Sequence, residues 1–256
     1  MLALPPKVSV ILITYNEEDN IHPCLSSVQW ADEIIVVDSY SKDKTVEIAK
    51  AYDRCKVISA TWKGFVPAKQ LALENTTNDW VLWIDADERV TKELQEEIIN
   101  GMQKSDAFVA FDIPRKTFFM NQWIKPWYPG RVIRLFNKNH CAFNNNILHE
   151  GLEIREANKL GHLKSDLLHY SYNSLHQYFC KMNLYGKYGA EELLRRDKKF
   201  QSWKLLLNPF STFIQFYFFK KGFLLGKSGL ILAIGSAYSN FIKYANFYYL
   251  VKDKNF

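Results

Sequence analysis

The sequence has few cysteines and no glycine-rich nucleotide loop. Its four cysteines, Cys24, Cys55, Cys141 and Cys180, lie far apart and form no C-x-x-C pair. This spacing argues against a zinc knuckle or a disulfide framework and suits a reducing compartment. Neither a G-x-G-x-x-G nor a Walker sequence occurs, which excludes a Rossmann dinucleotide site and a P-loop. Because no basic segment followed by an apolar run opens the chain, we expect no secretory signal.

Apolar runs long enough to cross a membrane are also lacking. Two uncharged stretches near the C-terminus, 205–219 and 228–242, have 15 residues each, short of the ~18 or more that a bilayer requires. Lysines flank them at Lys220, Lys221 and Lys227. Amphipathic segments that lie in the plane of a membrane surface fit this pattern better than transmembrane helices.

The net charge of +6 is unevenly distributed along the chain. Residues 1–180 carry a net charge of −3, whereas residues 181–256 carry +9 and are rich in aromatic side chains. The acidic first part argues against a nucleic-acid partner, since phosphate neutralisation dominates such interfaces. The basic, aromatic last part favours contact with an anionic membrane surface. The alternative is a pair of C-terminal helices that pack on the preceding domain and whose lysines are simply solvated.

Strands and helices alternate through the first hundred residues. Apolar residues make up 48% of the chain and charged residues 23%, a globular composition. Continuously apolar strands that alternate with helices predict a parallel sheet covered on both faces. We expect residues 108–169 to form an antiparallel extension with long loops. The predicted strands are 8–13, 34–37, 56–58 and 80–84, and the predicted helices are 17–30, 45–52 and 68–75.

Polar side chains follow three of the predicted strands. Residues 14–17 come after the first strand, Asp38 after the second, and residues 85–88 after the fourth. Ligands of open α/β sheets bind in the crevice at the carboxyl ends of the strands, so we expect these turns to meet in one pocket. Asp85 and Asp87 can both face one hard cation there. A purely structural turn is the alternative for that pair, because Asp favours turns.

Three segments then resemble the family-2 glycosyltransferases. They are VSVILITYNEE at 8–18, IIVVDSYSKDKT at 34–45 and WIDADE at 83–88. The resemblance implies an inverting enzyme with a GT-A-like nucleotide-sugar-binding fold. Later segments are similar to the subgroup that adds glucose to the inner core of lipopolysaccharide. Those segments are GRVIRLF at 130–136, LHE at 148–150, LHYSY at 168–172 and KKGFLLGKSG at 220–229.

The resemblance assigns the donor-binding residues position by position. Thr14, Tyr15 and Glu17 would line the nucleotide pocket, and Asp38 would contact the uracil or the ribose. Lys69 falls where the family often has an arginine. A lysine there could meet a phosphate, but only as a point charge without the bidentate contact of a guanidinium.

The same resemblance implies a divalent metal, Mg²⁺ or Mn²⁺, held by Asp87. Asp85 would contact the ribose or the metal. His169 is either a third ligand, since neutral imidazole binds metals, or a hydrogen-bonded core residue. Glu150 is the first choice for the base that takes the proton of the acceptor hydroxyl. His149 ranks below it, and a solvated loop carboxylate is the alternative for Glu150.

Two arginines and an aromatic cluster complete the candidates. Arg131 and Arg134, three positions apart on a predicted strand, should face opposite sides, so at most one of them contacts a phosphate. Trp123, Trp127 and Tyr128 could stack on sugars, but core packing is the favoured interpretation.

These observations predict an α/β catalytic domain over 1–175 and a helical, amphipathic region over 176–256. Within the catalytic domain, 1–105 would bind the nucleotide and 106–175 the acceptor. We expect the enzyme to move a hexose, from UDP-glucose, onto a heptose of the lipopolysaccharide core. It would work by metal-assisted single displacement at the inner face of the cytoplasmic membrane. The alternatives are a nucleotidyltransferase and a non-catalytic membrane-surface module.

Overall fold

The chain divides into two compact units with separate hydrophobic cores. The computed structural model describes residues 6–103, 107–144, 151–155 and 159–253. The first unit comprises the residues up to Thr117 together with Tyr128–Ser171. The second comprises Phe118–Trp127 and the chain from Tyr172 onward. Two of the three divisions fall within strands, β7 (Arg115–Phe119) and β13 (Leu167–Tyr172), and the third falls between Trp127 and Tyr128.

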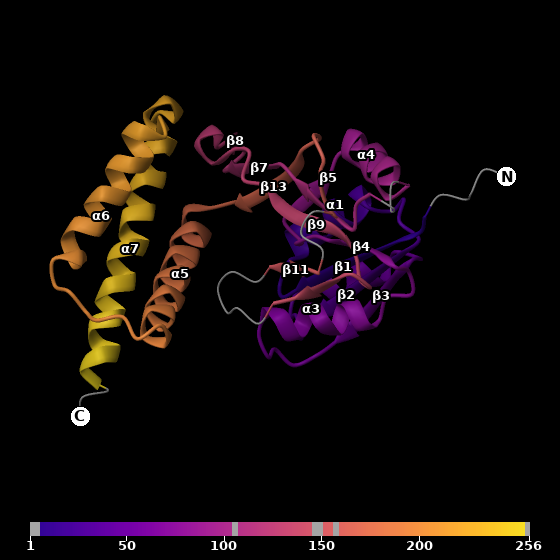
Figure 1. Ribbon diagram of the computed structural model, residues 1–256, viewed down its shortest axis with the longest axis horizontal. Coiled ribbons are helices and arrows are strands. Elements are labelled where there is room, and N and C mark those ends of the chain that lie inside the picture. Colours follow the sequence, from indigo (N-terminus) through magenta and orange to yellow (C-terminus); the bar gives the residue numbers. More distant parts are fainter. Residues whose placement is uncertain (1–5, 104–106, 145–150, 156–158, 254–256) are drawn as a thin grey trace. The chain divides into compact units, whose positions relative to one another are not determined.

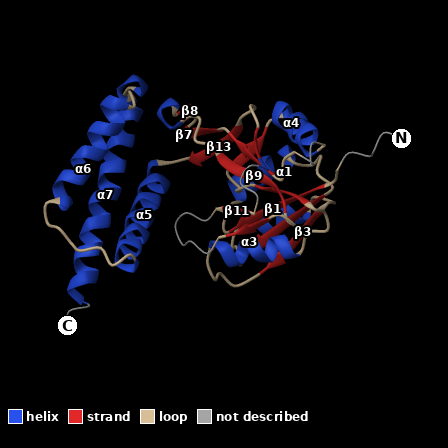
Figure 2. Cartoon of the chain, viewed as in Figure 1, coloured by secondary structure: helices blue, strands red, loops and turns tan. Residues whose placement is uncertain are grey.

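A seven-stranded sheet with the order β12-β6-β9-β4-β1-β2-β3 organises the first unit (Figures 1 and 2). Strands β3, β2, β1 and β4 are parallel to one another, and β12 is parallel to β6. Strand β9 runs antiparallel to both β4 and β6. The bounds are β1 (Val8–Thr14), β2 (Glu33–Asp38), β3 (Cys55–Ser59), β4 (Trp80–Trp83), β6 (Ala110–Ile113), β9 (Val132–Asn137) and β12 (Leu160–His162).

Helices cover both faces of this sheet because its strands are apolar on both sides. On one face, α1 (Glu18–Ser27), α2 (Thr45–Lys50) and α4 (Lys92–Met102) contribute to a core that includes Val10 and Val36. On the other face, α3 (Phe65–Glu74) packs with Ile11 and Val37. Figure 1 shows α3 on the side of the sheet away from α1 and α4. The predicted α/β fold with a mostly parallel central sheet is therefore confirmed.

The middle of the chain differs from the predicted antiparallel extension. Strand β9 is inserted into the main sheet between β4 and β6, so the sheet continues beyond it in the parallel sense. The smaller strands are β5 (Glu88–Val90), β8 (Gln122–Trp123), β10 (Cys141–Phe143) and β11 (Leu152–Ile154). They complete a four-stranded sheet, β5-β13-β7-β8, and a two-stranded ladder, β10-β11. In the four-stranded sheet β13 pairs with β5, and β5 begins at Glu88, directly after Asp85 and Asp87. The pairing therefore brings β13 next to these two aspartates.

Helix α3 begins three residues before the predicted position. Gly64 has a φ of 110° and ends the preceding loop, so the helix begins at Phe65. Pro67 lies in the first turn, where a missing backbone N–H costs no intrahelical hydrogen bond. Pro67, which directly precedes the predicted helix at 68–75, is therefore part of α3.

Three α-helices make up most of the described part of the second unit. They are α5 (Leu175–Arg195), α6 (Lys204–Ile214) and α7 (Lys227–Asp253), and both α5 and α6 pack along α7 (Figure 1). A π-helical turn, Gln215–Phe219, and a 3₁₀ turn, Gly222–Leu225, connect α6 to α7. None of the described helices combines the length and the apolarity that crossing a bilayer requires.

The core of this unit centres on Tyr178, which is fully buried in α5. Its hydroxyl donates to the backbone oxygen of Leu232 at 3.0 Å. Trp127, which precedes the boundary at Tyr128, packs edge-on against Tyr172 and Phe216. This contact is the core packing that the sequence favoured for Trp127.

Replacement of Gly235 by alanine should destabilise the second unit. A Cβ atom at Gly235 would overlap the ring of Tyr178, and overpacking of this kind costs about 1–3 kcal/mol. Ile234→Ala is the matched control, because Ile234 is the neighbouring residue on α7 and its side chain is half exposed. Urea unfolding should show a clear loss for Gly235→Ala and a smaller one for Ile234→Ala. Equal losses would contradict the close approach of α5 and α7.

Glu33 should stabilise the junction of β1, β2 and the turn before β4. Its Oε1 atom accepts from Ser9 Oγ, from Thr77 N at 2.6 Å and from Asn78 Nδ2 at 3.3 Å. Burial would raise the pKa of Glu33, but these hydrogen bonds outweigh it and lower the pKa. Glu33→Ala should cost about 1–3 kcal/mol at neutral pH.

The pH dependence of this contribution follows from the lowered pKa. The stabilisation is fully present above the ordinary glutamate pKa of about 4.3. It is lost as the pH falls through the lower pKa of the folded state. Urea titrations of Glu33→Ala and wild type at several pH values measure this. A difference in unfolding free energy that grows on acidification would contradict the assignment.

Candidate active site

The three polar turns predicted from the sequence lie at one edge of the main sheet. Strand β1 lies between β2 and β4, with Thr14 opposite Asp38 and Ile11 opposite Trp83. Ile84 N donates to Ile11 O at 3.2 Å, so Asp85 follows directly at the carboxyl end of β4. All three strands are parallel, and the turns that follow them therefore share the edge where α/β proteins bind ligands.

Asp38 shapes the loops after β1 and β2. It is 1% exposed, and it accepts from Thr14 Oγ1 at 3.2 Å and from the backbone N of Ser41 at 2.9 Å. Ser41 Oγ in turn accepts from the backbone N of Asn16 at 2.8 Å. Tyr15, by contrast, is exposed. The two loops are thus tied together at the sheet edge, while a contact between Asp38 and a nucleotide stays a prediction.

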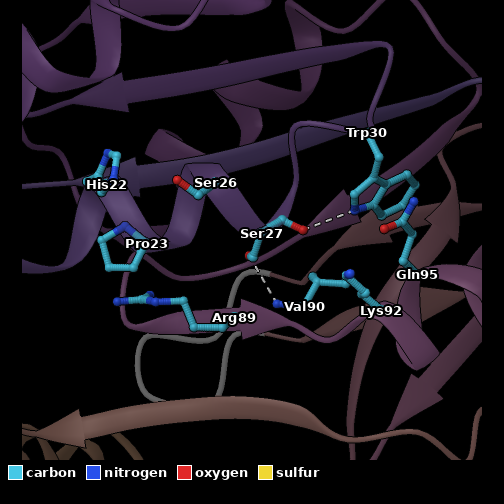
Figure 3. Close-up of a pocket in the computed structure, with 9 residues that line it drawn as sticks. All are labelled: His22, Pro23, Ser26, Ser27, Trp30, Arg89, Val90, Lys92 and Gln95. Atoms are coloured by element: carbon cyan, nitrogen blue, oxygen red, sulfur yellow. Dashed lines mark hydrogen bonds between the residues drawn. The ribbon is translucent and has the colours of Figure 1, made fainter.

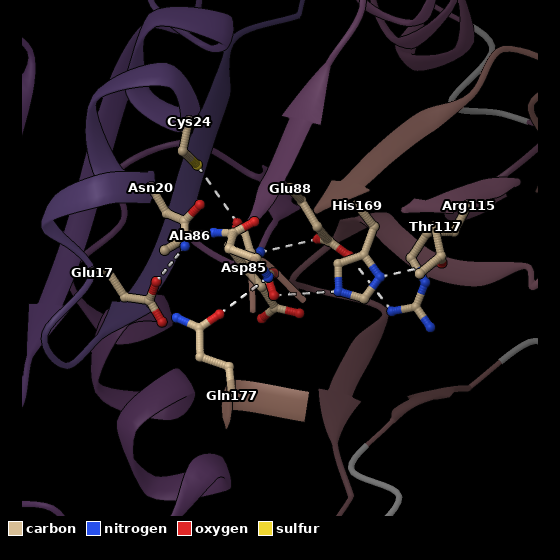
Figure 4. Close-up of polar contacts among 12 residues, drawn as sticks. Glu17, Asn20, Cys24, Asp85, Ala86, Glu88, Arg115, Thr117, His169 and Gln177 are labelled. Carbon is tan, nitrogen blue, oxygen red and sulfur yellow. Dashed lines mark hydrogen bonds and ion pairs between the residues drawn. The ribbon is translucent and has the colours of Figure 1, made fainter. Parts of the chain in front are cut away.

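Glu17 lies at the start of α1, on the same side of the sheet. Its Oε2 accepts from Asn20 Nδ2 at 2.9 Å (Figure 4), and its backbone N donates to Thr45 Oγ1 at 2.8 Å. The second bond connects the first residues of α1 to α2. The structure thus fixes the backbone of Glu17 beside the loop after β2, and its predicted contact with the nucleotide stays a prediction.

A buried arginine, Arg134, joins β9 to the turn formed by residues 85–88, called the acidic turn below. Arg134 Nη2 contacts Asp85 Oδ2 and, at 2.7 Å, Glu88 Oε1, which is fully buried. Glu88 Oε2 accepts from the backbone N of Asp85 at 3.0 Å (Figure 4), and Arg115 lies 3.6 Å from Glu88. Burial alone would raise the pKa of Asp85, but the charges of Arg134 and Lys69 keep it below its ordinary value. Asp85 is therefore ionised and already charge-compensated by the protein.

Trp83, the last residue of β4, lies against two cations. Lys69 Nζ is 3.7 Å from the centroid of its ring and Arg134 Cζ is 4.2 Å from it. Lys69 itself is 2% exposed, on α3. Cation–π contacts of this kind stabilise charges that have left water. Lys69 is thus buried near Asp85. The contact of Lys69 with a phosphate of the donor stays a prediction.

Asp87 and His169 come together although they are far apart in the sequence. His169 Nε2 lies 3.4 Å from Asp87 Oδ2, and both side chains are mostly buried. The other ring nitrogen, Nδ1, is 3.3 Å from Thr117 Oγ1 (Figure 4). The antiparallel pairing of β13 with β5 places His169 opposite Glu88 and so creates this contact.

These donors fit a divalent cation shared with a substrate. A carboxylate and an imidazole 3.4 Å apart can bind one ion, and Mg²⁺ is commonly held by one or two carboxylates together with substrate phosphates. In the part of the chain that the structure describes, no three or more His, Cys, Asp or Glu side chains lie close enough together to hold one metal ion. Asp85 is turned to Arg134, so Asp87 is the better placed carboxylate.

The structure places Arg131 differently from the sequence prediction. Strand β9 begins at Val132, so Arg131 lies before the strand and not on it. Arg131 contacts Asp112 and donates to Leu163 O at 2.8 Å, away from the network of Arg134. The prediction that both arginines lie on one strand is therefore wrong. Glu150 and His149 lie outside the described residues.

Arg89 is a residue that the sequence interpretation missed. Its Nη1 donates to Ala86 O at 2.6 Å and to Glu88 O at 2.8 Å, and its Nη2 donates to Asn20 Oδ1 at 3.3 Å. Arg89 thereby fixes the backbone of the acidic turn against α1. No local signal distinguishes it from a solvated arginine, because its partners are two backbone oxygens and the side chain of Asn20, which lies far away in the sequence.

A groove of about 640 Å³ lies next to this region, between α1 and the start of α4 (Figure 3). No carboxylate lines it, so it does not contain the metal-binding chemistry of the acidic turn. Its lining is His22, Pro23, Ser26, Ser27, Trp30, Arg89, Val90, Lys92 and Gln95.

The sheet and its acidic edge give the first unit an α/β fold of the GT-A type. The solved structure of the mannosyltransferase PcManGT from Pyrobaculum calidifontis, in complex with GDP-Man and Mn²⁺, has a similar fold, with a TM-score of 0.57. It is 14% identical, over 96% of this chain and 88% of that one. The chain belongs to glycosyl transferase family 2, whose family model matches residues 9–160.

Curated relatives agree with this family over most of the chain. An uncharacterized glycosyltransferase of Rickettsia typhi is 34% identical over 93% of this chain and 86% of its own length. The lipopolysaccharide core biosynthesis glycosyltransferase LpsC of Rhizobium meliloti is 28% identical over 94% of this chain and 92% of its own. The protein is therefore a glycosyltransferase, and the alternatives of a nucleotidyltransferase and a non-catalytic module are set aside.

Replacement of Arg134 by methionine should strongly destabilise the first unit. The change leaves the fully buried Glu88 without its closest cation, and breaking one side of a buried ion pair costs about 3–5 kcal/mol. Arg131→Met is the control, because Arg131 is partly exposed and its partner Asp112 also contacts His162. We expect a loss below about 2 kcal/mol for this control. Urea unfolding measures both, and a loss for Arg134→Met no larger than the control would refute the central role of the buried pair.

Proposed function

We propose that the protein transfers a hexose from a nucleotide sugar, UDP-glucose, to a heptose of the lipopolysaccharide inner core. The observation that carries the proposal is the contact of Asp87 with His169 just beyond the carboxyl end of β4, at the same sheet edge where Asp38 ends β2. The similarity to LpsC over nearly the whole chain supports the acceptor class. The mannosyltransferase structure with GDP-Man and Mn²⁺ supports a nucleotide-sugar donor and a metal.

In this proposal, each side chain of the edge has a separate role. Thr14, Tyr15 and Glu17 line the nucleotide pocket together with Asp38. Asp85, which Arg134 keeps ionised, accepts a hydrogen bond from the ribose. Lys69 adds positive charge beside the departing diphosphate as a point charge.

Asp87 and His169 are the residues that would hold a divalent metal ion. Such an ion neutralises the charge that develops on the diphosphate when the sugar–phosphate bond breaks. His169 is oriented by its contact with Thr117, and the second partner of a metal-bound imidazole fixes its tautomer. The protein thus presents a preformed carboxylate–imidazole pair to the donor.

The acceptor side of the proposal is a single displacement with inversion. Glu150 takes the proton of the acceptor hydroxyl during attack on the anomeric carbon, since an alcohol is a weak nucleophile without a base. We assign the nucleotide to residues 1–105 and the acceptor to 106–175. Residues 176–256 form the membrane-facing region.

A donor screen tests the proposal directly. Purified protein is incubated with Mn²⁺ and a panel of UDP- and GDP-sugars, and the release of nucleotide is measured. We expect UDP-glucose to give the fastest release, and faster still with a heptose-containing core oligosaccharide. Release from every donor at the rate without protein would refute the proposed reaction.

Matched variants test the assigned roles. Glu150→Gln should lower transfer by at least about a hundredfold, the range typical for loss of an acid–base group. Asp87→Ala should lower it by a similar factor, because it removes a carboxylate that would hold the metal. Asp53→Ala and Glu153→Gln, both exposed carboxylates of the first unit, are the controls and should keep wild-type turnover. Wild-type turnover in Asp87→Ala and Glu150→Gln would show that these assignments are wrong.

A further inference from the structure

The charge of the second unit has one sign over a long segment. Between Asp197 and Asp253 the chain contains eight lysines and no aspartate, glutamate or arginine. Surfaces of globular proteins normally mix both signs of charge. Four of these lysines, Lys204, Lys220, Lys221 and Lys227, flank α6 and the turns that connect it to α7.

Helix α6 leaves an apolar face uncovered within this segment. Trp203, Leu206, Leu207 and Phe210 recur at intervals of three and four residues, so they share one face of the helix. This face, the α6 stripe, is exposed, with Leu206 at 71% and Phe210 at 66%. The opposite side packs on α7, where Asn240 donates to Thr212 Oγ1 at 2.8 Å. No residue of α6 is fully buried.

The turns after α6 present a second exposed apolar group. Phe218, Phe219, Phe223 and Leu224 form this aromatic tip, in which Phe219 is 80% exposed and Leu224 is 70% exposed. Lys220 and Lys221 lie between its two halves in the sequence and are exposed as well. The aromatic tip therefore combines large apolar side chains with adjacent ammonium groups.

We infer that the α6 stripe and the aromatic tip are a docking surface for a lipid bilayer with anionic headgroups. Apolar side chains at this spacing enter the boundary between headgroups and acyl chains, and neighbouring lysines contact lipid phosphates. A second copy of the chain is a poorer occupant, because it would bring the same lysines against this surface and repel them. The inference does not depend on the identity of the donor or of the acceptor.

Vesicle sedimentation of the full-length protein, without nucleotide, tests this surface. We expect binding to vesicles of equal parts phosphatidylcholine and phosphatidylglycerol, and at least about tenfold weaker binding to phosphatidylcholine alone. The double variant Leu206→Glu/Phe210→Glu should lower binding to the mixed vesicles by more than about tenfold. The variant Lys220→Gln/Lys221→Gln should also lower it by about tenfold or more.

The control variant is Leu175→Glu/Leu184→Glu, which adds the same charge at two exposed leucines of α5 in the same unit. It should bind the mixed vesicles like the wild type. All variants replace exposed side chains, and circular dichroism checks that each one is folded. Wild-type binding by Leu206→Glu/Phe210→Glu, or equal loss in the control, would overturn the inference.

Two further outcomes also decide the matter. Equal binding to both kinds of vesicle would overturn the role of anionic headgroups. Self-association without lipid that Leu206→Glu/Phe210→Glu abolishes would assign the surface to a second copy instead. Nucleotide release is measured separately without vesicles. If it fails while vesicle binding persists, only the proposed reaction is refuted. The reverse result refutes the docking surface, and with it the membrane-facing role proposed for residues 176–256, but not the reaction.

Discussion

The ion pairs of Arg134 with Asp85 and Glu88 are the interactions on which the candidate active site depends. Glu88 is fully buried and Arg134 nearly so, and charges in such a position are tolerated only when they are paired. Arg134 thereby fixes the start and the end of the acidic turn at the same time. Asp87, between them, is left to face His169. The geometry of the turn is thus set by charge compensation from β9 and by backbone bonds from Arg89.

This arrangement explains why the two aspartates of the turn differ. Asp85 shares Arg134 with Glu88 and lies near Lys69, so its charge is already balanced within the protein. Asp87 has a histidine beside it, and an imidazole can itself be a metal ligand. Within one Asp-x-Asp sequence, Asp85 is therefore the carboxylate held by Arg134, and Asp87 is the candidate metal ligand. Strand β9, which lies between β6 and β4 in the main sheet, contributes Arg134 and so holds Asp85 in place.

Much of the first unit could be predicted from local sequence. The apolar runs at 8–13, 34–37 and 80–84 became β1, β2 and β4 in a parallel arrangement, since strands buried on both faces need continuous apolar residues. The insertion of β9 into the sheet could not be predicted, because its pairing with β4 joins segments more than fifty residues apart. The same limit applies to the second unit, where the sequence indicated amphipathic helices but not which apolar side chains α7 covers.

By itself, the sequence determined which strand ends carry carboxylates, because the position of a residue after a strand is a local property. It also determined the one-signed charge of the last part of the chain. Only the tertiary structure decided that His169 meets Asp87 and that Arg134 lies between Asp85 and Glu88, since these contacts depend on the register of distant strands. It also decided that Lys69 is buried against Trp83 and that one face of α6 is left uncovered. Burial is a property of the whole packing and not of any single helix.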